Sequence, residues 1–309
     1  MISDGVLLID KGFGLTSSEA VQTVKRLTDS RKTGHTGTLD PCATGLLIMT
    51  LGRATKISTY LDTGRKRYLA KIRLGESRET YDRFGKLFDR QNVSIEFEEI
   101  EHILNDFEGD FEQIIPRYSA AHVEGKRMYK MARRGEETPI KKKIVKIYEI
   151  NILEYDPPFL ELDIACESGT YIRSIAHQLG QSLGCGAHIY TLVRTEAGRF
   201  KLDRAVTLVQ LEAAIKMELF DDYFIPIDNA LAMPSIVIGR PKSEGVKQGR
   251  EIFESDAAPG EMRFSKGDRI TVKSDLGRLL AIGKALISSD ELAKGSCEKT
   301  KVFEYKRVI

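Results

Sequence analysis

"GHTGTLDPCATGLLIMTLG", residues 34–52, joins a glycine-rich loop, one aspartate and an apolar run. The run GLLIMTLG is typical of a buried β-strand, so Asp40 lies in the loop that leads into this strand. Asp40 is the only acidic residue between Asp29 and Asp62. Asp followed by Pro is also a common turn pair. The stretch alone is therefore compatible with a plain turn and with a functional carboxylate.

The bulk composition describes a globular chain with room for about two domains, because it has 309 residues, 41% of them hydrophobic and 30% charged. No stretch approaches the roughly 20 continuous apolar residues of a membrane span, and the N-terminus lacks the pattern of a signal peptide. We expect a cytoplasmic protein without a membrane segment. Four dispersed cysteines and five histidines without an H-x-x-x-H pair indicate neither a disulfide framework nor a metal site.

Alternation and helical periodicity predict the main elements of the first 220 residues. RYLAKIRLG alternates apolar and basic residues, which predicts a half-buried strand with Tyr68 near its start. Thr16 and Glu19 have the spacing of a capping box at the start of a helix. Strands are expected at residues 6–10, 67–75 and 159–166, and helices at 16–27, 97–107 and 171–184.

Arg173 falls in the first turn of the helix predicted over residues 171–184. A cation at this end opposes the helix dipole, so helix stability does not explain it. An arginine there is well suited to hold a carboxylate or a phosphate. A surface arginine is equally compatible with the pattern.

Residues 126–146 carry nine Lys or Arg against two Glu, with Tyr129 among them. Such a run is either a solvated face or a surface that holds nucleic-acid backbone. Past the linker PIDNALAMPS, residues 226–235, the chain changes to short strands and turns. We therefore expect two domains, 1–230 and 235–309, the second a small β-barrel.

Several stretches in this order resemble the bacterial tRNA pseudouridine synthase B family, and the tail resembles a PUA domain, a small RNA-binding β-barrel. The resemblance implies isomerisation of the uridine at position 55, in the T-loop of tRNA, to pseudouridine. It also implies an α+β fold, with a mixed, largely antiparallel central sheet, flanking helices and a basic insertion around residues 120–146. The stretches are GHTGTLDPCATGLL, KRYLAKIRLG, ETYDRFG, PRYSAAHVEGKRMYKMARRG, CESGTYIRSIAHQLG, GAHIYTLVRTEAG and, in the tail, GRPKSEGVKQG and FSKGDRITV.

The resemblance also assigns roles to residues of this chain. Asp40 matches the essential aspartate, Tyr68 the tyrosine that stacks on the target base, and Arg173 the arginine that pairs with the aspartate. Leu192 matches an apolar residue beside the base. The further residues expected to meet the RNA are His35, Lys56, Lys141, Lys142 and Lys143. Gly12 and His122 stand where the family usually has proline and lysine, which affects details of RNA binding.

The implied reaction breaks the bond between N1 and C1′ and joins C5 of the uracil to the same sugar carbon. The product is an isomer, so no cofactor or metal is expected, and the chain shows neither a Walker loop nor a dinucleotide fingerprint. Glycoside hydrolysis by water commonly uses two carboxylates. A single Asp without an obvious partner carboxylate therefore suits a reaction that excludes water. Asp40 would act as a nucleophile or as a base, and the sequence leaves both open.

The expected partner is tRNA, bound through its T stem-loop and, by the C-terminal domain, near its acceptor end. We expect a monomer. We also expect that it needs no guide RNA, because guide-dependent relatives lack the long basic insertion. The alternative is a non-catalytic RNA-binding or tRNA-folding protein on the same scaffold. Such a protein would keep the basic segments and tolerate the loss of Asp40.

Overall fold

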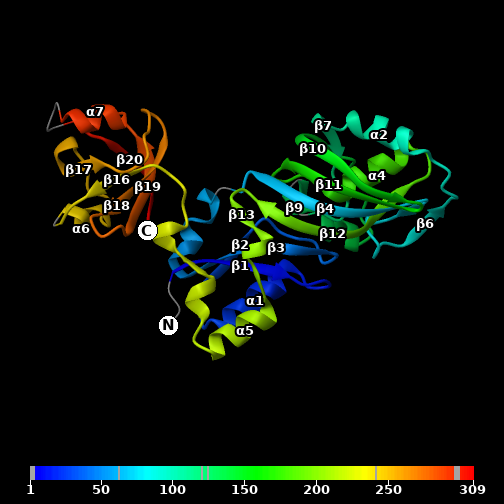
Figure 1. Ribbon diagram of the computed structural model, residues 1–309, viewed down its shortest axis with the longest axis horizontal. Helices are drawn as coiled ribbons and strands as arrows, with labels where there is room; N and C mark the ends of the chain where they lie inside the picture. Colours follow the sequence, from blue (N-terminus) through cyan, green and yellow to red (C-terminus); the bar gives the residue numbers. More distant parts are fainter. Residues whose placement is uncertain (1–3, 62, 120, 124, 241, 296–299) are drawn as a thin grey trace.

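The computed structural model describes residues 4–61, 63–119, 121–123, 125–240, 242–295 and 300–309. Within these residues, a large mixed sheet forms the main body, and a separate five-stranded sheet forms the C-terminal region. Figure 1 shows the C-terminal sheet at one end of the long axis of the molecule. No described helix is long and apolar enough to cross a membrane.

The main sheet is mixed and largely antiparallel, which confirms the predicted fold class. Along its main path, only the pairs β1–β14 and β3–β12 are parallel within the described residues. The three further strands β2, β13 and β15 pair with β3, β12 and β1. In spatial order the path is β14 (Val206–Thr207), β1 (Gly5–Lys11), β3 (Ala43–Leu51), β12 (Ala187–Ala197), β4 (Arg65–Leu74), β11 (Phe159–Glu167), β10 (Lys142–Asp156) and β7 (Gly109–Ile114), with β2 at Thr33–Thr36, β13 at Phe200–Lys201 and β15 at Phe224–Pro226.

The helices pack on one face of this sheet and bury its apolar side chains. On β4 the buried residues are every second one from Lys66 to Leu74, as the alternation predicts. The predicted capping box is present, since the Thr16 side chain accepts a hydrogen bond from the Glu19 amide. The helices are α1 (Ser17–Leu27) and α5 (Leu208–Lys216) over the β1 part, α2 (Phe97–Asn105) over β10, and α4 (Ile172–Ser182) over β12 and β7 (Figure 1).

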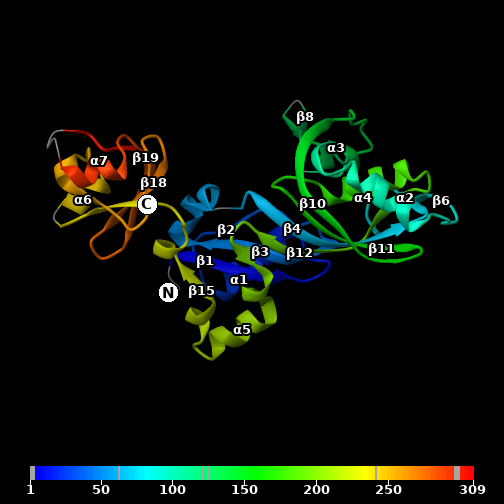
Figure 2. The same cartoon turned by 45° about the horizontal axis from the view of Figure 1, so that its top comes forward.

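The basic insertion leaves the main sheet after β7 and returns at the start of β10. It contains β8 (His122–Val123), β9 (Lys126–Arg127) and α3 (Met128–Arg133), which Figure 2 shows beside β10. Lys142 and Lys143 are already in β10, opposite Ile114 and Gln113 of β7. Because Val145 and Ile147 are buried, the alternation that holds β10 in the sheet extends back into the lysine run.

The C-terminal sheet is joined to the main body by an apolar contact. Leu279, Ile282 and Ile309 belong to the same buried cluster as Ile57 and Ile227 of the main body. Its elements are β16 (Ser235–Ile238), β17 (Ala257–Pro259), β18 (Arg269–Ser274), β19 (Leu279–Ala285), β20 (Phe303–Val308), α6 (Lys242–Val246) and α7 (Ser289–Lys294). The strands follow the order β17-β16-β18-β19-β20.

Candidate active site

Asp40 and Arg173 form an ion pair at the N-terminus of α4. Asp40 lies in the loop between β2 and β3, and its Oδ2 is 2.8 Å from the Nε of Arg173. The contact is an ion pair rather than an aligned hydrogen bond, because no acceptor in the described part of the chain lies in line with this N–H. The Arg173 side chain is only 4% exposed, whereas the Asp40 side chain is 37% exposed. The carboxylate is therefore accessible to a substrate, while the cation that holds it is buried.

Arg173 also binds two backbone segments. Its Nη1 donates to the carbonyl of Thr80 at 2.9 Å, and its Nη2 donates to the carbonyl of Tyr118 at 3.0 Å. Burial lowers the pKa of the Arg173 guanidinium, but the charges of Asp40 and Asp82 outweigh burial and raise the pKa above its ordinary value. One side chain thus joins the Asp40 loop, the loop before β6 (Leu87–Arg90) and the base of the basic insertion.

A second carboxylate, Asp82, shares Arg173 with Asp40, which differs from the sequence expectation of a single unpartnered Asp. Its Oδ2 is 3.7 Å from Arg173 Nη1, and its Oδ1 accepts hydrogen bonds from Thr80 Oγ1 and the Phe84 amide. Asp82 is 6% exposed and does not line the open part of the site. The sequence signal that could have identified Asp82 is its position in ETYDRFG, one of the stretches that carry the resemblance.

Cys42 lies beneath the Asp40 loop, beside Asp82. Its Sγ is 3.6 Å from Asp82 Oδ2. Burial and the charge of Asp82 raise the pKa of the Cys42 thiol, so it stays protonated at neutral pH. The thiol is therefore a hydrogen-bond donor that helps to fix Asp82.

Tyr68 and Leu192 form an apolar wall in the same core cluster as Leu39, the residue before Asp40. Tyr68 on β4 is 6% exposed, and Leu192 on β12 is 5% exposed. Leu192 is opposite Ala70, and the register shifts at Tyr190, so a β-bulge sets which β12 side chains face this wall. Burial raises the pKa of the Tyr68 hydroxyl, although the nearby charge of Arg194 lowers it.

Lys66 and Arg194 are two buried cations on the same side of the sheet, and the sequence did not indicate either. Arg194 Nε and Nη2 donate to the carbonyls of Leu46 and Gly37, each at 2.8 Å. Its Nη1 is buried and has no hydrogen-bond acceptor in the described part of the chain. Burial and the charge of Arg194 lower the pKa of Lys66 to about 8.

The Asp40 loop is braced from the end of β1. The Lys11 ammonium donates to the carbonyls of Leu15 at 2.7 Å and Gly12 at 3.1 Å. The Gly14 amide then donates to the carbonyl of Pro41 at 2.9 Å, directly after Asp40. Lys11 is fully buried, and burial lowers its pKa. Its role in the structure is to hold this loop.

His35 and Lys56 lie on neighbouring elements of the outer part of the site. His35 is half-buried on β2, and burial together with the charge of Arg194 lowers its pKa. Lys56 is exposed at the end of the short helix η1 (Gly52–Lys56), and its Nζ donates to the Val308 carbonyl at 3.3 Å. Lys56 lines a groove of about 330 Å³ with Asp4, Asp29, Ser30, Arg31, Lys32, Gly52, Arg53 and Thr55.

The three consecutive lysines have different surroundings. The Lys141 ammonium donates to the carbonyl of His122 at 3.0 Å. Lys142 forms an ion pair with Glu112 at 2.8 Å. The Lys143 ammonium donates to the carbonyl of Gly169 and lies 4.8 Å from the centre of the Tyr171 ring, and burial lowers its pKa. The run therefore leads from the insertion to the start of α4.

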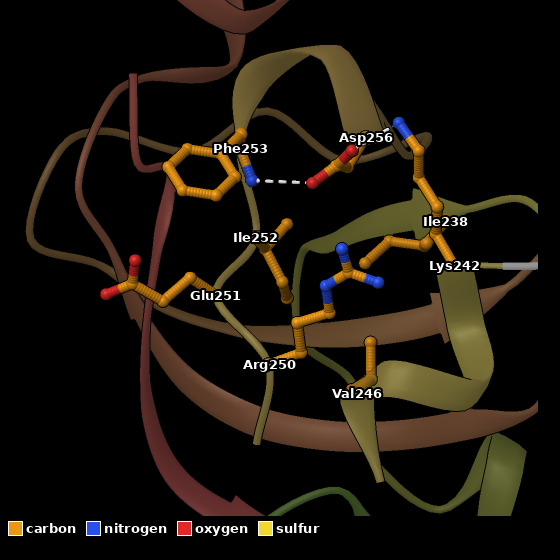
Figure 3. Close-up of a pocket in the computed structure, with 8 residues that line it drawn as sticks. All are labelled: Ile238, Lys242, Val246, Arg250, Glu251, Ile252, Phe253 and Asp256. Carbon is orange, nitrogen blue, oxygen red and sulfur yellow. Dashed lines mark hydrogen bonds and ion pairs between the residues drawn. The ribbon is translucent and has the colours of Figure 1, made fainter. Parts of the chain in front are cut away.

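A second pocket, of about 220 Å³, lies in the C-terminal domain (Figure 3). Figure 3 shows Lys242 paired with Asp256, whose carboxylate also accepts a hydrogen bond from the Phe253 amide at 3.0 Å. Its lysine is thus already neutralised. No cluster of three His, Cys, Asp or Glu in the described residues could hold a metal ion.

Solved structures share this fold over nearly the whole chain. A Cbf5–Nop10–Gar1 complex matches with a TM-score of 0.73 and 27% identity, over 98% of this chain and 84% of the other. An H/ACA RNP bound to a substrate RNA containing 2′-deoxyuridine matches with a TM-score of 0.74 and 26% identity, over the same shares. The alignments are long enough to include the C-terminal sheet.

Family models and curated relatives indicate to which protein family the chain is similar. Residues 25–172 match the TruB family pseudouridylate synthase N-terminal domain, and residues 173–232 match the tRNA pseudouridylate synthase B C-terminal domain. A protein of Solibacter usitatus (strain Ellin6076) named tRNA pseudouridine synthase B is 38% identical over 92% of this chain and 96% of its own length. The protein of that name from Escherichia coli O139:H28 (strain E24377A / ETEC) is also 38% identical, over 86% and 88%.

The fold, the ion-paired aspartate and these matches define the class, a pseudouridine synthase, which is an isomerase. The chain belongs to the TruB family of pseudouridylate synthases. This confirms the family and the type of enzyme that the sequence predicts.

Proposed function

We propose that this enzyme isomerises the uridine at position 55, in the T-loop of tRNA, to pseudouridine, with Asp40 as the central catalytic group. The observation that carries the proposal is the Asp40–Arg173 ion pair, 2.8 Å long, in the same site as the Tyr68 and Leu192 wall. The names of the curated relatives support tRNA as the substrate.

The target base is stacked inside a folded loop and must be extruded before it reaches Asp40, at a cost of a few kcal/mol. Stacking on the Tyr68 ring recovers part of this cost, since base–aromatic stacking contributes roughly 1–3 kcal/mol. Leu192 packs beside the base and excludes water. Without water at C1′, the detached uracil is the only acceptor for the sugar carbon, which favours isomerisation over hydrolysis.

The bond changes balance within the nucleoside. The N1–C1′ bond breaks, the uracil turns in the pocket, and its C5 bonds to C1′. The C5 proton then leaves, and N1 of the product carries a proton. Asp40 either attacks the sugar or the base as a nucleophile or removes the C2′ proton as a base, and its exposed carboxylate fits both roles. The Tyr68 hydroxyl would assist departure of the C5 proton.

Arg173 and Asp82 hold Asp40 in position. Arg173 pairs with the Asp40 carboxylate through its positive charge, and its two backbone contacts fix the direction of its Nε. Asp82 lies on the other side of the same guanidinium, where it limits rotation of Arg173. Both roles act through Asp40, so we assign Arg173 and Asp82 as positioning residues.

The rest of the chain would bind tRNA outside the reacting nucleotide. His35 and the groove that contains Lys56 face the T stem-loop, and Lys141, Lys142 and Lys143 contact its backbone from the insertion side. The C-terminal PUA-like sheet reaches the acceptor end. The enzyme acts as a cytoplasmic monomer without cofactor or metal.

Two alternatives differ in observable ways. A non-catalytic RNA-binding protein would bind tRNA and leave the uridine unchanged, whatever residue stood at position 40. A guide-dependent enzyme, like those in the H/ACA complexes that share the fold, would need a second RNA. The basic insertion around residues 120–146 and the 38% identity to proteins named tRNA pseudouridine synthase B favour stand-alone action.

The test is to incubate the protein alone with an unmodified tRNA transcript and to map pseudouridine by chemical derivatisation and sequencing. We expect pseudouridine at position 55 only, in a reaction that needs neither metal nor guide RNA. A transcript with cytidine at position 55 is the control for site choice. Modification at another uridine would contradict the T-loop assignment, and binding without modification would support the non-catalytic alternative.

A further inference from the structure

Lys66 and Arg194 are positive charges in the interior that no carboxylate of the described residues pairs with. Lys66 is 6% exposed and Arg194 is 1% exposed. Among the described residues, no Asp or Glu forms an ion pair with either side chain, although the chain forms many such pairs elsewhere. Isolated buried charges are costly, so proteins commonly keep them only where a ligand or partner compensates them.

The two cations meet at one point of the Asp40 loop. A Cβ on Gly37 would lie 3.0 Å from Lys66 Nζ and 3.2 Å from Arg194 Nη1. Gly37 has a φ of +66°, which favours glycine and lets the backbone approach both groups. Arg194 Nη1, which has no aligned acceptor among the described residues, therefore lies close to the Lys66 ammonium, although the Tyr68 hydroxyl also interacts with the Arg194 guanidinium.

This pair is contiguous with the base pocket. Lys66 and Tyr68 are two residues apart on β4 and face the same side of the sheet. Arg194 is opposite Tyr68 in the register of β4 and β12, and Leu192 is two residues before it. An anion that reaches Lys66 would therefore lie beside a base stacked on Tyr68.

We propose that Lys66, with Arg194 behind it, binds a phosphodiester of the target nucleotide, the one on its 5′ or its 3′ side. This inference rests on the proposed function, because it requires that the target uridine enters the cleft. RNA supplies one phosphate per nucleotide, and a desolvated ammonium–phosphate contact is strong. Lys66 is the outer cation and makes the contact, whereas Arg194 adds charge from below.

The charges around Lys66 support an anion rather than a neutral group. The neighbours that act on it are Arg194 of β12, Cys166 of β11 and Lys143 of β10. Lys143 lowers the pKa of Lys66, as Arg194 does, and the pKa of the Cys166 thiol is raised to about 11. The site therefore has excess positive charge at neutral pH, which a phosphate would neutralise.

The experiment measures binding with stem-loop RNAs that carry one uncharged methylphosphonate linkage, placed on the 5′ or the 3′ side of the target uridine. All proteins carry Asp40→Asn so that turnover does not change the RNA during the measurement. Lys66→Met removes the charge and keeps a long apolar side chain. Lys71→Met is the matched control, because it removes the same charge from the opposite face of β4, where Lys71 pairs with Glu161.

We expect Lys66→Met to raise the Kd for normal RNA about ten-fold or more, since a charged hydrogen bond is lost. With the methylphosphonate at the contacted linkage, Lys66→Met should change Kd by less than about two-fold. Lys66→Arg should restore most of the affinity for normal RNA. Lys71→Met should leave Kd within about two-fold of the parent for every RNA.

Three results would overturn the proposal. The first is a Lys66→Met effect that persists at full size on both methylphosphonate RNAs. The second is an unchanged Kd of Lys66→Met for normal RNA, and the third is a variant that melts well below the parent, which would indicate a structural role. Failure of the proposed function is seen separately. It would appear as pseudouridine at the wrong uridine, or as none, when the wild-type protein acts on the same RNA.

Discussion

Two groups of buried cations near Asp40 and Tyr68 differ in how their charge is compensated; we call Arg173 with Asp40 and Asp82 the compensated wall, and Lys66 with Arg194 the uncompensated wall. On one wall, Arg173 is buried among two carboxylates and two carbonyls, so its charge is compensated before any RNA binds. On the other wall, Lys66 and Arg194 are buried without a carboxylate among the described residues. The first arrangement positions Asp40 in the free enzyme. The second is incomplete until an anion arrives, which is typical of a binding surface rather than a preformed catalytic group.

The largest expected effect comes from removing the one exposed charge of the compensated wall. Asp40→Asn should abolish pseudouridine formation, by more than about a thousand-fold, because an essential nucleophile or base usually contributes at least that much. Binding of T-arm RNA should stay within a few fold of wild type. Single-turnover derivatisation and an equilibrium binding assay measure the two quantities. Residual turnover above about a thousandth of the wild-type rate would show that Asp40 is not central.

Arg173→Lys tests whether geometry as well as charge is needed on that wall. Lysine keeps the charge but cannot hold Asp40 and the carbonyls of Thr80 and Tyr118 together, so kcat should fall about a hundred-fold. The melting temperature should also fall, since two buried carbonyls lose their donors. Arg67→Lys, which alters an ion pair with Asp163 on the other face of β4, is the control. Equal kcat in Arg173→Lys and wild type would remove Arg173 from the positioning network.

Tyr68 is close to both walls, since Asp40 and Arg194 both act on its hydroxyl, and its ring and hydroxyl can be tested separately. Tyr68→Phe should keep RNA affinity and slow product formation, because stacking remains and the hydroxyl is lost. Tyr68→Leu should weaken affinity as well, by roughly ten-fold or more. The same changes at Tyr148, 42% exposed on β10, should alter neither quantity. Similar affinity and rate in the Phe and Leu variants at position 68 would contradict a stacking role.

The local part of this site could be predicted from the sequence, and the long-range part could not. Alternation along β4 predicts the inward face of Tyr68, and the helix start predicts the place of Arg173, because both depend on neighbouring residues. The capping box at Thr16 was likewise predicted from local spacing and is confirmed. The fold class followed from the resemblance and not from these local patterns.

The compensated and uncompensated walls both depend on contacts between distant parts of the chain. Asp82 contacts Arg173 from a loop, and a loop has no hydrophobic periodicity from which its path could be predicted. Arg194 lies close to Lys66 because two β-bulges set the register of β12 against β4. A one-residue slip would turn Arg194 to the other face. The extent of the insertion also could not be predicted, since Lys142 and Lys143, expected within the basic insertion, belong to β10 of the main sheet.

The buried charge of Lys66 in the uncompensated wall should destabilise the folded protein to a degree that depends on pH. The pKa of Lys66 is lowered to about 8 from 10.5, so between these values the unfolded chain holds a proton that the folded protein has lost. The free energy of unfolding therefore rises with pH across this window, and the penalty of the buried charge is fully present below pH 8. Lys66→Met, which lacks the charge, should be more stable than wild type at pH 7. The stability difference should shrink by on the order of 2 kcal/mol towards pH 10.5.

Chemical denaturation of both proteins at several pH values measures this difference. Lys71→Met serves again as the control and should show no such convergence, because Lys71 is paired and partly exposed. The other groups that act on Lys66 are Arg194, Lys143 and Cys166, and the raised pKa of Cys166 delays its ionisation. A Lys66→Met protein less stable than wild type at pH 7 would mean that the ammonium is satisfied in the free enzyme, and the contrast between the walls would be lost.

The smallest expected effect concerns Lys141, Lys142 and Lys143, which would extend the cationic wall outward along the RNA backbone. Changing all three to Met should raise KM and flatten the salt dependence of binding, because each lost phosphate contact removes roughly 0.7 to 0.9 from the slope of log K against log salt. The value of kcat at saturating RNA should barely change.

Among single variants, Lys143→Met should have the largest effect, since its ammonium lies beside Tyr171 at the start of α4. Lys142→Met should have the smallest effect, since Glu112 already neutralises Lys142. Lys216→Met, which removes a lysine paired with Glu212 on α5, controls for net charge. An unchanged slope in the triple variant would show that the run is a solvated strand edge, and the cationic wall would then end at Lys66.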